Sequence, residues 1–463
     1  MPQNEDDALI LGKEKISKLL WKFALPAIAA MLASSVYNVI AGIFIADIDA
    51  YAISGVGLTG PIMNLAAAFG ALVGVGASVV CSISLGEKNY EKARQVLANL
   101  VILNFIIGII VSAIGLIFLD PILVFFGASD KTLPFAHDYM MIILAGNIFA
   151  HMFLGLNSVL RVSGYPTTSM NLTFLSVIIN LILAPTFIYG MDMGVRGAAL
   201  ATVIAQIICC IAIFYIFSDK NKTVYFEKNK FKLSPAIIRQ SFAIGSPNFF
   251  TNAAACFVVM IQNSKLLEYG GDLYIGGMSI VNRIVFIFFM IALGFSQGMQ
   301  PIVAYNFGAQ KYHRMWEAFS LTLKCALCVT VSATLICELY PELLTSLFVS
   351  AGDPASRQLF DITVKTFRYV MPAFWIIAFQ VIGSNFFASM NQPHKSLFLS
   401  LTRQVILMVP LLYILPRFWG THGVWIISPI TDFSAALVAI LLLYLQKEKD
   451  KVLLTSPHDE LTI

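Results

Sequence analysis

Charged residues are scarce in this sequence. Asp, Glu, Lys and Arg together make up 12% of its 463 residues, whereas about 25% is usual in soluble domains. Hydrophobic residues make up 58%, and the mean hydropathy is +0.80. These values exclude an ordinary soluble protein and predict a polytopic membrane protein. The net charge of +4 comes from short basic stretches between apolar runs, which is typical of membrane topology and indicates no nucleic-acid partner.

Histidine and cysteine are also scarce, with six and seven residues. The cysteines all lie in apolar runs, so we interpret them as small buried hydrophobic residues rather than disulfide partners. Five histidines lie at predicted loops or chain ends, and His151 stands alone in an apolar run. No cluster has catalytic or metal-ligand spacing. The sequence therefore predicts a protein that is not an enzyme and that has no metal or cofactor.

The apolar runs predict the fold class. Because a spanning helix needs about 20 mostly apolar residues, we expect an all-α fold with twelve transmembrane helices. Their approximate positions are 19–46, 52–84, 96–126, 135–160, 169–190, 195–217, 238–265, 274–305, 315–348, 360–388, 396–416 and 423–445. Lys and Arg are concentrated in alternate connecting segments, which places both termini in the cytoplasm. We expect a multi-pass protein of the inner or plasma membrane.

The two halves of the chain repeat one another. Phe23-Ala24-Leu25-Pro26 is matched by Phe242-Ala243-Ile244 and Pro247, and the stretch from Gly86 to Tyr90 is matched by that from Gly308 to Tyr312. Because six is an even number, both copies start on the same side, and the sequence predicts two parallel six-helix repeats around a central cleft. The predicted segments are 1–18 (cytoplasmic), 19–217 (N-lobe), 218–237 (cytoplasmic linker), 238–445 (C-lobe) and 446–463 (cytoplasmic tail).

Three polar residues, Asn180, Thr202 and Gln206, lie deep in the fifth and sixth predicted spans. A polar group without a partner in hydrocarbon costs several kcal/mol, so such groups are retained most readily around a wet cavity or an ion path. Pro185 is expected to free backbone acceptors in the middle of the fifth span. A binding site is our first interpretation. The alternative is a hydrogen bond across a helix contact, with a simple proline kink.

Asp432 lies near the centre of the twelfth predicted span, where a charge is costly. We interpret it as part of a substrate or ion pathway or, alternatively, as the buried partner of a basic residue such as Arg403. Arg403 could equally extend to the cytoplasmic surface. Other intramembrane candidates for the pathway are Asn282, Arg283 and Gln300.

Several strings resemble one known family, the multidrug and toxic compound extrusion transporters. In the first half they are Pro26, Tyr37-Asn38, Gly57-Leu58, Pro61, Gly74-Val75-Gly76-Ala77-Ser78, Asn180, Pro185-Thr186-Phe187-Ile188-Tyr189-Gly190 and Gly194-Val195-Arg196-Gly197. In the second half they include Gln297-Gly298-Met299-Gln300-Pro301, Ser400-Leu401-Thr402-Arg403-Gln404 and Pro429-Ile430-Thr431-Asp432. The resemblance runs from about Phe23 to Leu445. It implies two lobes around a V-shaped cleft, export of organic cations and drugs, and drive by an inward H⁺ or Na⁺ gradient.

The sequence departs from the family at two acidic positions. The resemblance implies an aspartate a few residues after Tyr37-Asn38 and another just before Pro185, but this chain has Ala41 and Ala184. Other members of the family's N-lobe cation site are present as Tyr139, Asn180 and Thr202. Neutral oxygens ligate Na⁺ weakly, and without a carboxylate this pocket has no group that titrates near neutral pH. Coupling through this site is therefore in question.

These observations predict a multidrug or organic-cation efflux transporter that works as an H⁺ or Na⁺ antiporter by alternating access. Its partners would be drug-like small molecules and membrane lipid, and we expect a monomer. One alternative is a flippase for a lipid-linked saccharide, although the set of intramembrane basic residues is small for that role. Another is a transporter whose coupling is deficient because of Ala41 and Ala184. A membrane-embedded enzyme is disfavoured because no catalytic cluster is present.

Overall fold

The computed structural model describes residues 10–349 and 354–454, and within these ranges the chain is almost entirely helical. The first repeat contains α2 (Ile16–Ala46), α3 (Ala50–Gly86), α4 (Tyr90–Ile117), α5 (Leu119–Phe125), α6 (Leu133–Val162), α7 (Pro166–Pro185), the π-helix η1 (Thr186–Gly190) and α8 (Gly194–Ser218). The 3₁₀ turn η2 (Lys228–Lys230) follows in the linker. The second repeat contains α9 (Pro235–Gly270), α10 (Asp272–Gly308), α11 (Tyr312–Leu339), α12 (Pro341–Ser346), α13 (Pro354–Val370), η3 (Phe374–Ile376), α14 (Ile377–Ser389), α15 (Pro393–Leu401), the π-helix η4 (Thr402–Met408) and α16 (Val409–Leu454).

The prediction of twelve spans is confirmed. Ten helices of the described residues are long and apolar enough to cross a membrane, and the bent pair Pro354–Val370 and Phe374–Ser389 adds an eleventh. The helix Pro393–Lys451 has 59 residues, and its backbone leaves helical geometry at Gly420. Because this length is about twice what one span requires, it counts as two, which gives twelve.

Three details differ from the expected spans. The third and ninth spans are shorter than predicted, because α4 ends at Ile117 and α11 at Leu339, and short separate helices follow each of them. The tenth span is bent by 49°. Pro185 lies only five residues before the end of the fifth span at Gly190, so the expected break in the middle of that span is wrong. The helix continues past the proline as the π-helix η1, which ends at Gly190.

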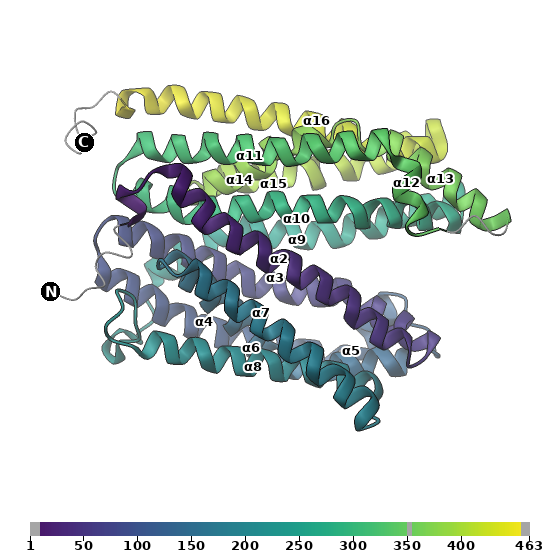
Figure 1. The fold of residues 1–463 in the computed structure, drawn as a ribbon, viewed down its shortest axis with the longest axis horizontal. Coiled ribbons are helices and arrows are strands. Elements are labelled where there is room, and N and C mark those ends of the chain that lie inside the picture. Colours follow the sequence, from purple (N-terminus) through teal and green to yellow (C-terminus); the bar gives the residue numbers. More distant parts are fainter. Residues whose placement is uncertain (1–9, 350–353, 455–463) are drawn as a thin grey trace. The chain divides into compact units, whose positions relative to one another are not determined.

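The described residues divide into two compact units. Unit 1 lies within Met1–Phe249 and Ala304–Gln310, and unit 2 within Phe250–Val303 and Lys311–Ile463. Figure 1 shows the helices of each unit lying alongside one another. The predicted limits of the lobes, linker and tails stay a prediction.

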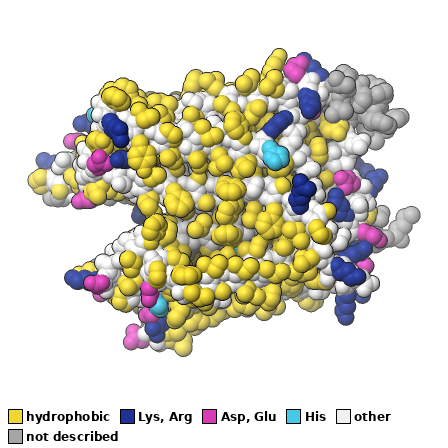
Figure 2. All heavy atoms as spheres, turned by 180° about the vertical axis from the view of Figure 1, so that it is seen from behind, with side chains coloured by type: hydrophobic (Ala, Val, Ile, Leu, Met, Phe, Trp, Pro, Cys, Tyr) yellow, Lys and Arg dark blue, Asp and Glu magenta, His cyan; other side chains and the backbone are white. Residues whose placement is uncertain are grey.

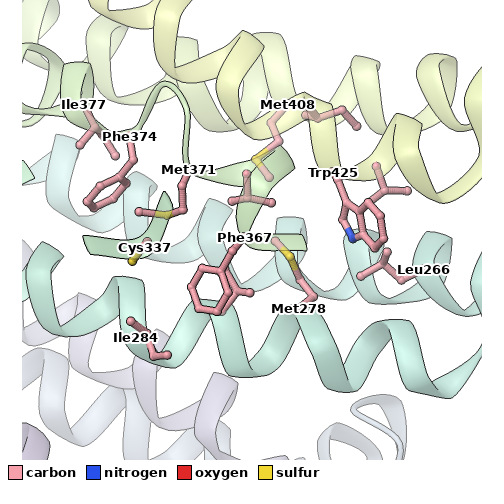
Figure 3. Packing of buried hydrophobic residues seen from close by; sticks show 14 of the residues in the cluster. Leu266, Met278, Ile284, Cys337, Phe367, Met371, Phe374, Ile377, Met408 and Trp425 are labelled. Atoms are coloured by element: carbon pink, nitrogen blue, oxygen red, sulfur yellow. The ribbon is translucent and has the colours of Figure 1, made fainter. Parts of the chain in front are cut away.

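Each unit has its own apolar core. In unit 1 the core includes Ile62, Leu123, Met140 and Leu144. In unit 2 it includes Phe367, Met371 and Trp425, whose side chains extend between the helices in Figure 3. Much of the outer surface is apolar as well, and the visible face in Figure 2 is largely hydrophobic. Cys328 is exposed, which corrects the interpretation of all seven cysteines as buried, since a lipid-facing helix surface is as apolar as a core.

The backbone repeats the irregular features of the first copy in the second. Lys88 and Gln310, third in the matched turns, have φ angles of 57° and 59°. Gly194, the first residue of α8, and Gly420, at the break within α16, have φ angles of 54° and 55°. Positive φ is costly for most residues, so its recurrence at matched positions confirms that one six-helix unit occurs twice. The π-helices η1 and η4 also recur at the fifth helix of each copy.

The linker after α8 is tied to the start of α4. The Asn99 side chain donates to the Lys232 carbonyl oxygen at 3.0 Å and accepts from the Ser234 N–H at 2.8 Å. Arg94 forms an ion pair with Glu227 at 3.6 Å, and its guanidinium lies 4.1 Å from the ring centre of Tyr225. The linker is therefore an ordered part of unit 1 rather than a loose tether.

Candidate functional site

Three of the predicted site residues meet in unit 1. The Thr202 hydroxyl of α8 donates to the Ala198 carbonyl oxygen at 3.1 Å. It therefore accepts from the Asn180 amide of α7 at 3.2 Å and from the Tyr37 hydroxyl of α2 at 3.4 Å. Asn180 is 3% exposed, and its carbonyl oxygen Oδ1 is buried with no hydrogen-bond partner among the described residues. The cluster thus presents one uncompensated acceptor, which is a suitable ligand for a cation or a donor.

The two alanines lie beside this cluster in different surroundings. Ala184 is buried in the unit 1 core together with Tyr139 and Ala198, the residue whose carbonyl binds Thr202. Ala41 is half-buried on α2, one turn beyond Tyr37. A carboxylate in place of either alanine would therefore lie near the polar cluster. The hydrogen-bonded groups of the cluster itself carry no charge.

In unit 2 the structure decides between the interpretations of Asp432. Its carboxylate accepts from Arg403 Nε at 2.5 Å, and the side chains are 3% and 23% exposed, respectively. Arg403 is the second residue of the π-helix η4, and π-helical turns are frequent at functional sites. Arg403 therefore pairs with Asp432, and both belong to one buried charged site.

A second polar network in unit 2 was only partly predicted. The Gln300 amide of α10 donates to Asn385 Oδ1 of α14 at 2.9 Å. On the same helix, the Ser384 hydroxyl lies 3.0 Å from Ser396 Oγ and 2.7 Å from Ser400 Oγ. Gln300 is among the site residues predicted from the sequence, whereas Ser384 and Ser396 are not. A serine in an apolar run gives a weak signal, because it can satisfy its hydroxyl on its own helix.

The other predicted site residues are not brought into these clusters. Gln206 is half-buried on α8, and Asn38, Asn282 and Arg283 are exposed. None of the four makes a side-chain hydrogen bond within the described part of the chain. Their roles in a pathway stay predictions.

Comparison with known proteins decides the family. The family model MatE matches residues 26–186 and 247–414, which together are more than half of the chain. The chain belongs to the MatE family. The match falls in both copies, over most of the first five helices of each, so both halves of this MatE protein carry the family's pattern.

Curated relatives match the chain along almost its full length. The multidrug export protein MepA of Staphylococcus haemolyticus is 28% identical over 442 residues, covering 95% of this chain and 96% of that protein. MepA of Staphylococcus aureus is 26% identical over 438 residues, covering 94% of this chain and 95% of that protein.

Solved structures agree on the fold of this MatE protein. One is described as an outward-facing conformation of a multidrug resistance MATE family transporter; it is similar with a TM-score of 0.90 at 22% identity, covering 97% of this chain and 99% of that one. A transporter from Pyrococcus furiosus, whose description reports a binding pocket of reverse polarity, has the same score, identity and coverage. These similarities establish a shared transporter fold.

Proposed function

We propose that this protein is a secondary active exporter of drug-like organic cations, driven by an inward gradient of H⁺ or Na⁺ and working by alternating access. The observation that carries the proposal is family membership over both repeats, with curated relatives that are multidrug export proteins along 94–95% of this chain. These relatives give no support to the alternative of a lipid-linked saccharide flippase. We further propose that the protein acts as a monomer in the inner or plasma membrane.

The polar cluster of unit 1 supports a cation-binding role. Asn180 Oδ1, the Thr202 hydroxyl and the Tyr37 hydroxyl are neutral oxygen groups within one hydrogen-bonded cluster. Neutral oxygens can ligate Na⁺ but hold it less tightly than a carboxylate does. We therefore propose that this site contributes to coupling, and that coupling through it is weak because alanine occupies positions 41 and 184.

Efflux of a fluorescent cationic dye from proteoliposomes tests the proposal, with H⁺ and Na⁺ gradients applied separately. We expect gradient-dependent efflux, reduced by Thr202→Val because the cluster loses its shared hydroxyl. Thr334→Val is the matched control, since among the described residues this hydroxyl bonds only the Thr330 carbonyl of its own helix, at 2.9 Å. Dye retention under every gradient would contradict the export function, and equal effects of the two variants would contradict the role of the cluster.

Orientation is tested by labelling single cysteines from outside the cell, in a background with Cys328→Ala to remove an exposed native thiol. We expect labelling of Met191→Cys and not of Asn229→Cys, because the linker around Asn229 is strongly basic. Met191 is 60% exposed, and it is preferable to its neighbour Asp192, whose φ of 52° disfavours most residues. The reverse labelling pattern would overturn the proposed cytoplasmic position of the linker.

A further inference from the structure

The structure contains one imidazole in the middle of unit 1. His151 lies in α6 and is 0% exposed. Its Nε2 is 2.8 Å from the Ala66 carbonyl oxygen of α3. A carbonyl oxygen only accepts, so Nε2 carries the hydrogen, and the lone pair of the neutral ring is on Nδ1. Nδ1 is buried and has no hydrogen-bond partner among the described residues.

A second buried acceptor lies at the same crossing of helices. The Asn104 amide of α4 donates from Nδ2 to the backbone carbonyl of His151 at 3.0 Å. Asn104 is 0% exposed, and its Oδ1 also lacks a partner in the described part of the chain. His151 Nδ1 and Asn104 Oδ1 are thus two buried acceptors that can each take up a hydrogen-bond donor, whereas most buried polar atoms are already satisfied.

The side chains of His151 and Asn104 are closely surrounded by the backbone of the neighbouring helices. A Cβ added at Gly70 would lie 2.8 Å from His151 Cδ2, and one added at Gly155 would lie 2.2 Å from Asn104 Nδ2. The absence of side chains at these glycines lets α3, α4 and α6 approach closely enough to fix both polar groups. Asn147, one turn before His151 on the same helix, is also buried, and its Nδ2 has no partner within the described residues.

The charged side chains of the helices packed against His151 lie near the ends of those helices. On α6 itself they are His137, Asp138 and Arg161; α4 carries Glu91, Lys92 and Arg94; α5 carries Asp120; and α8 carries Arg196. All lie in the first or last two turns of their helices. α3 and α7 contribute no charged residue, and the uncharged titratable groups are Tyr51 and Cys81 on α3, Tyr90 on α4, Tyr139 on α6, and Cys209, Cys210 and Tyr215 on α8. No charged group of these helices therefore lies beside the His151 ring to hold it in one protonation state.

We propose that His151 Nδ1 is a proton-binding site, and that its protonation and release couple H⁺ movement to export in this chain. A proton adds to the Nδ1 lone pair and Nε2 keeps its bond to Ala66, while Asn104, which bonds the His151 backbone carbonyl, contributes an unpartnered acceptor to the same helix crossing. The ligand is H⁺ rather than Na⁺, because an imidazole nitrogen is basic whereas Na⁺ prefers oxygen ligands. His151 thus supplies unit 1 with a titratable group, which the alanines at positions 41 and 184 do not. This inference rests on the proposed export function.

The first test measures protonation without transport. Deuterium exchange at the ring C2 of each histidine, followed by mass spectrometry of the purified full chain across pH 5 to 9, reports which rings titrate. We expect a sigmoidal pH dependence at His151. His137, an exposed ring 2.6 Å from Asp120, is the internal control that shows the method works. An exchange rate at His151 that does not change with pH would overturn the proposal.

The second test measures coupling. With dye-loaded proteoliposomes, His151→Gln should reduce the stimulation of efflux by an inward H⁺ gradient by about fivefold or more, the range of a typical coupling free energy, while dye binding is retained. His137→Gln is the matched control and should leave the stimulation unchanged. Asn104→Asp supplies a second reporter, because a carboxylate on the residue that contacts the His151 backbone favours a protonated ring and should move the pH midpoint of efflux upward.

The outcomes separate this inference from the proposed function. If no gradient drives efflux by the parent protein, the export function fails, while the exchange measurement still decides whether His151 binds a proton. If the parent responds to the H⁺ gradient and His151→Gln responds equally, His151 is a structural residue and the inference is wrong. If His151→Gln does not fold, an unshifted pH midpoint in Asn104→Asp contradicts the inference in its place.

Discussion

The two repeats hold different side chains at equivalent positions of their fifth and sixth helices. Arg403 lies ten residues after Pro393. Its equivalent in the first copy is Ser176, which lies ten residues after Pro166. Asp432 lies twelve residues after Gly420. Its equivalent in the first copy is Gln206, which lies twelve residues after Gly194. Unit 2 therefore has a buried ion pair at the positions where unit 1 has two neutral polar residues.

This difference shows that the fold itself does not require the ion pair. Both copies have the same helix order, and both have a glycine with positive φ where the sixth helix begins. A buried ion pair is weak evidence for stability, because desolvation offsets much of the attraction. The pair is therefore a specific feature of unit 2, and it provides a charged site that unit 1 lacks.

Other hydrogen bonds are retained in both copies. In unit 2, Ser384 lies within hydrogen-bonding distance of Ser396 and Ser400. The equivalent residues in unit 1 are Asn157, Ser169 and Thr173, and the Asn157 amide donates to Thr173 Oγ1 at 3.2 Å. Polar contacts that join the fourth and fifth helices thus persist, whereas the charged pair does not.

The largest expected effect comes from breaking the ion pair on one side. Arg403→Ser leaves the Asp432 carboxylate buried without its partner, which should cost about 3–5 kcal/mol of stability. Arg403→Ser combined with Asp432→Gln installs the residue types of unit 1 and should recover most of that loss. Thermal unfolding in detergent measures both. A double variant as unstable as the single one would show that unit 2 needs the charges to fold.

Asp432→Asn separates function from stability at the same site. It keeps the shape of the side chain and removes its charge, and the Arg403 side chain, which is 23% exposed, is not left fully buried without a partner. We expect export to fall while membrane expression stays near that of the parent. Full export by this variant would assign the pair a structural role only.

The next prediction adds charge to unit 1. A carboxylate close to a cation gains on the order of 4 kcal/mol at an effective dielectric of 20, before desolvation. Ala41→Asp with Ala184→Asp should therefore increase ion-dependent efflux in proteoliposomes under an applied H⁺ or Na⁺ gradient. Because Ala184 is buried in the core, its substitution also carries a packing cost, and Ala184→Asn is the matched uncharged control. Equal efflux by parent and double variant would show that coupling does not use this pocket.

A smaller loss of stability is expected from substituting Gly86 and Gly308, which are equivalent residues of the two copies. A Cβ at Gly86 would lie 2.0 Å from the Tyr305 carbonyl oxygen, and one at Gly308 would lie 2.2 Å from that of Ile83. Gly86→Ala and Gly308→Ala should each cost about 1–3 kcal/mol, because backbone must move to admit a methyl group. Gly42→Ala, which meets nothing within 4 Å, is the control. Unfolding midpoints unchanged relative to Gly42→Ala would contradict the close crossing.

The smallest effect concerns the retained hydroxyl contacts. Ser384→Ala should cost about 1 kcal/mol, the net value of a typical hydrogen bond, and Asn157→Ala should cost a similar amount in unit 1. Thermal unfolding of both variants gives the comparison. A loss confined to one unit would show that the network supports the fold in only one copy.

The sequence was sufficient to predict the twelve spans and the repeat, because helices in a membrane must satisfy their backbone internally and must be apolar over about 20 residues. Asn180 and Thr202 were found for the same reason, since a polar residue stands out in an apolar run. The breaks after Ile117 and Leu339 were missed, because apolar residues continue through them.

Only the tertiary structure decided which polar residues meet. Arg403 and Asp432 are 29 residues apart in sequence, and either could have faced solvent or another partner. The unpartnered atoms of Asn180 and His151 are likewise invisible in sequence, because a missing hydrogen bond depends on every neighbouring helix at once. The sequence by itself thus determined how many helices span the membrane and that they form two copies, since those properties follow from local composition. Packing between distant helices determined where charge and unsatisfied acceptors lie.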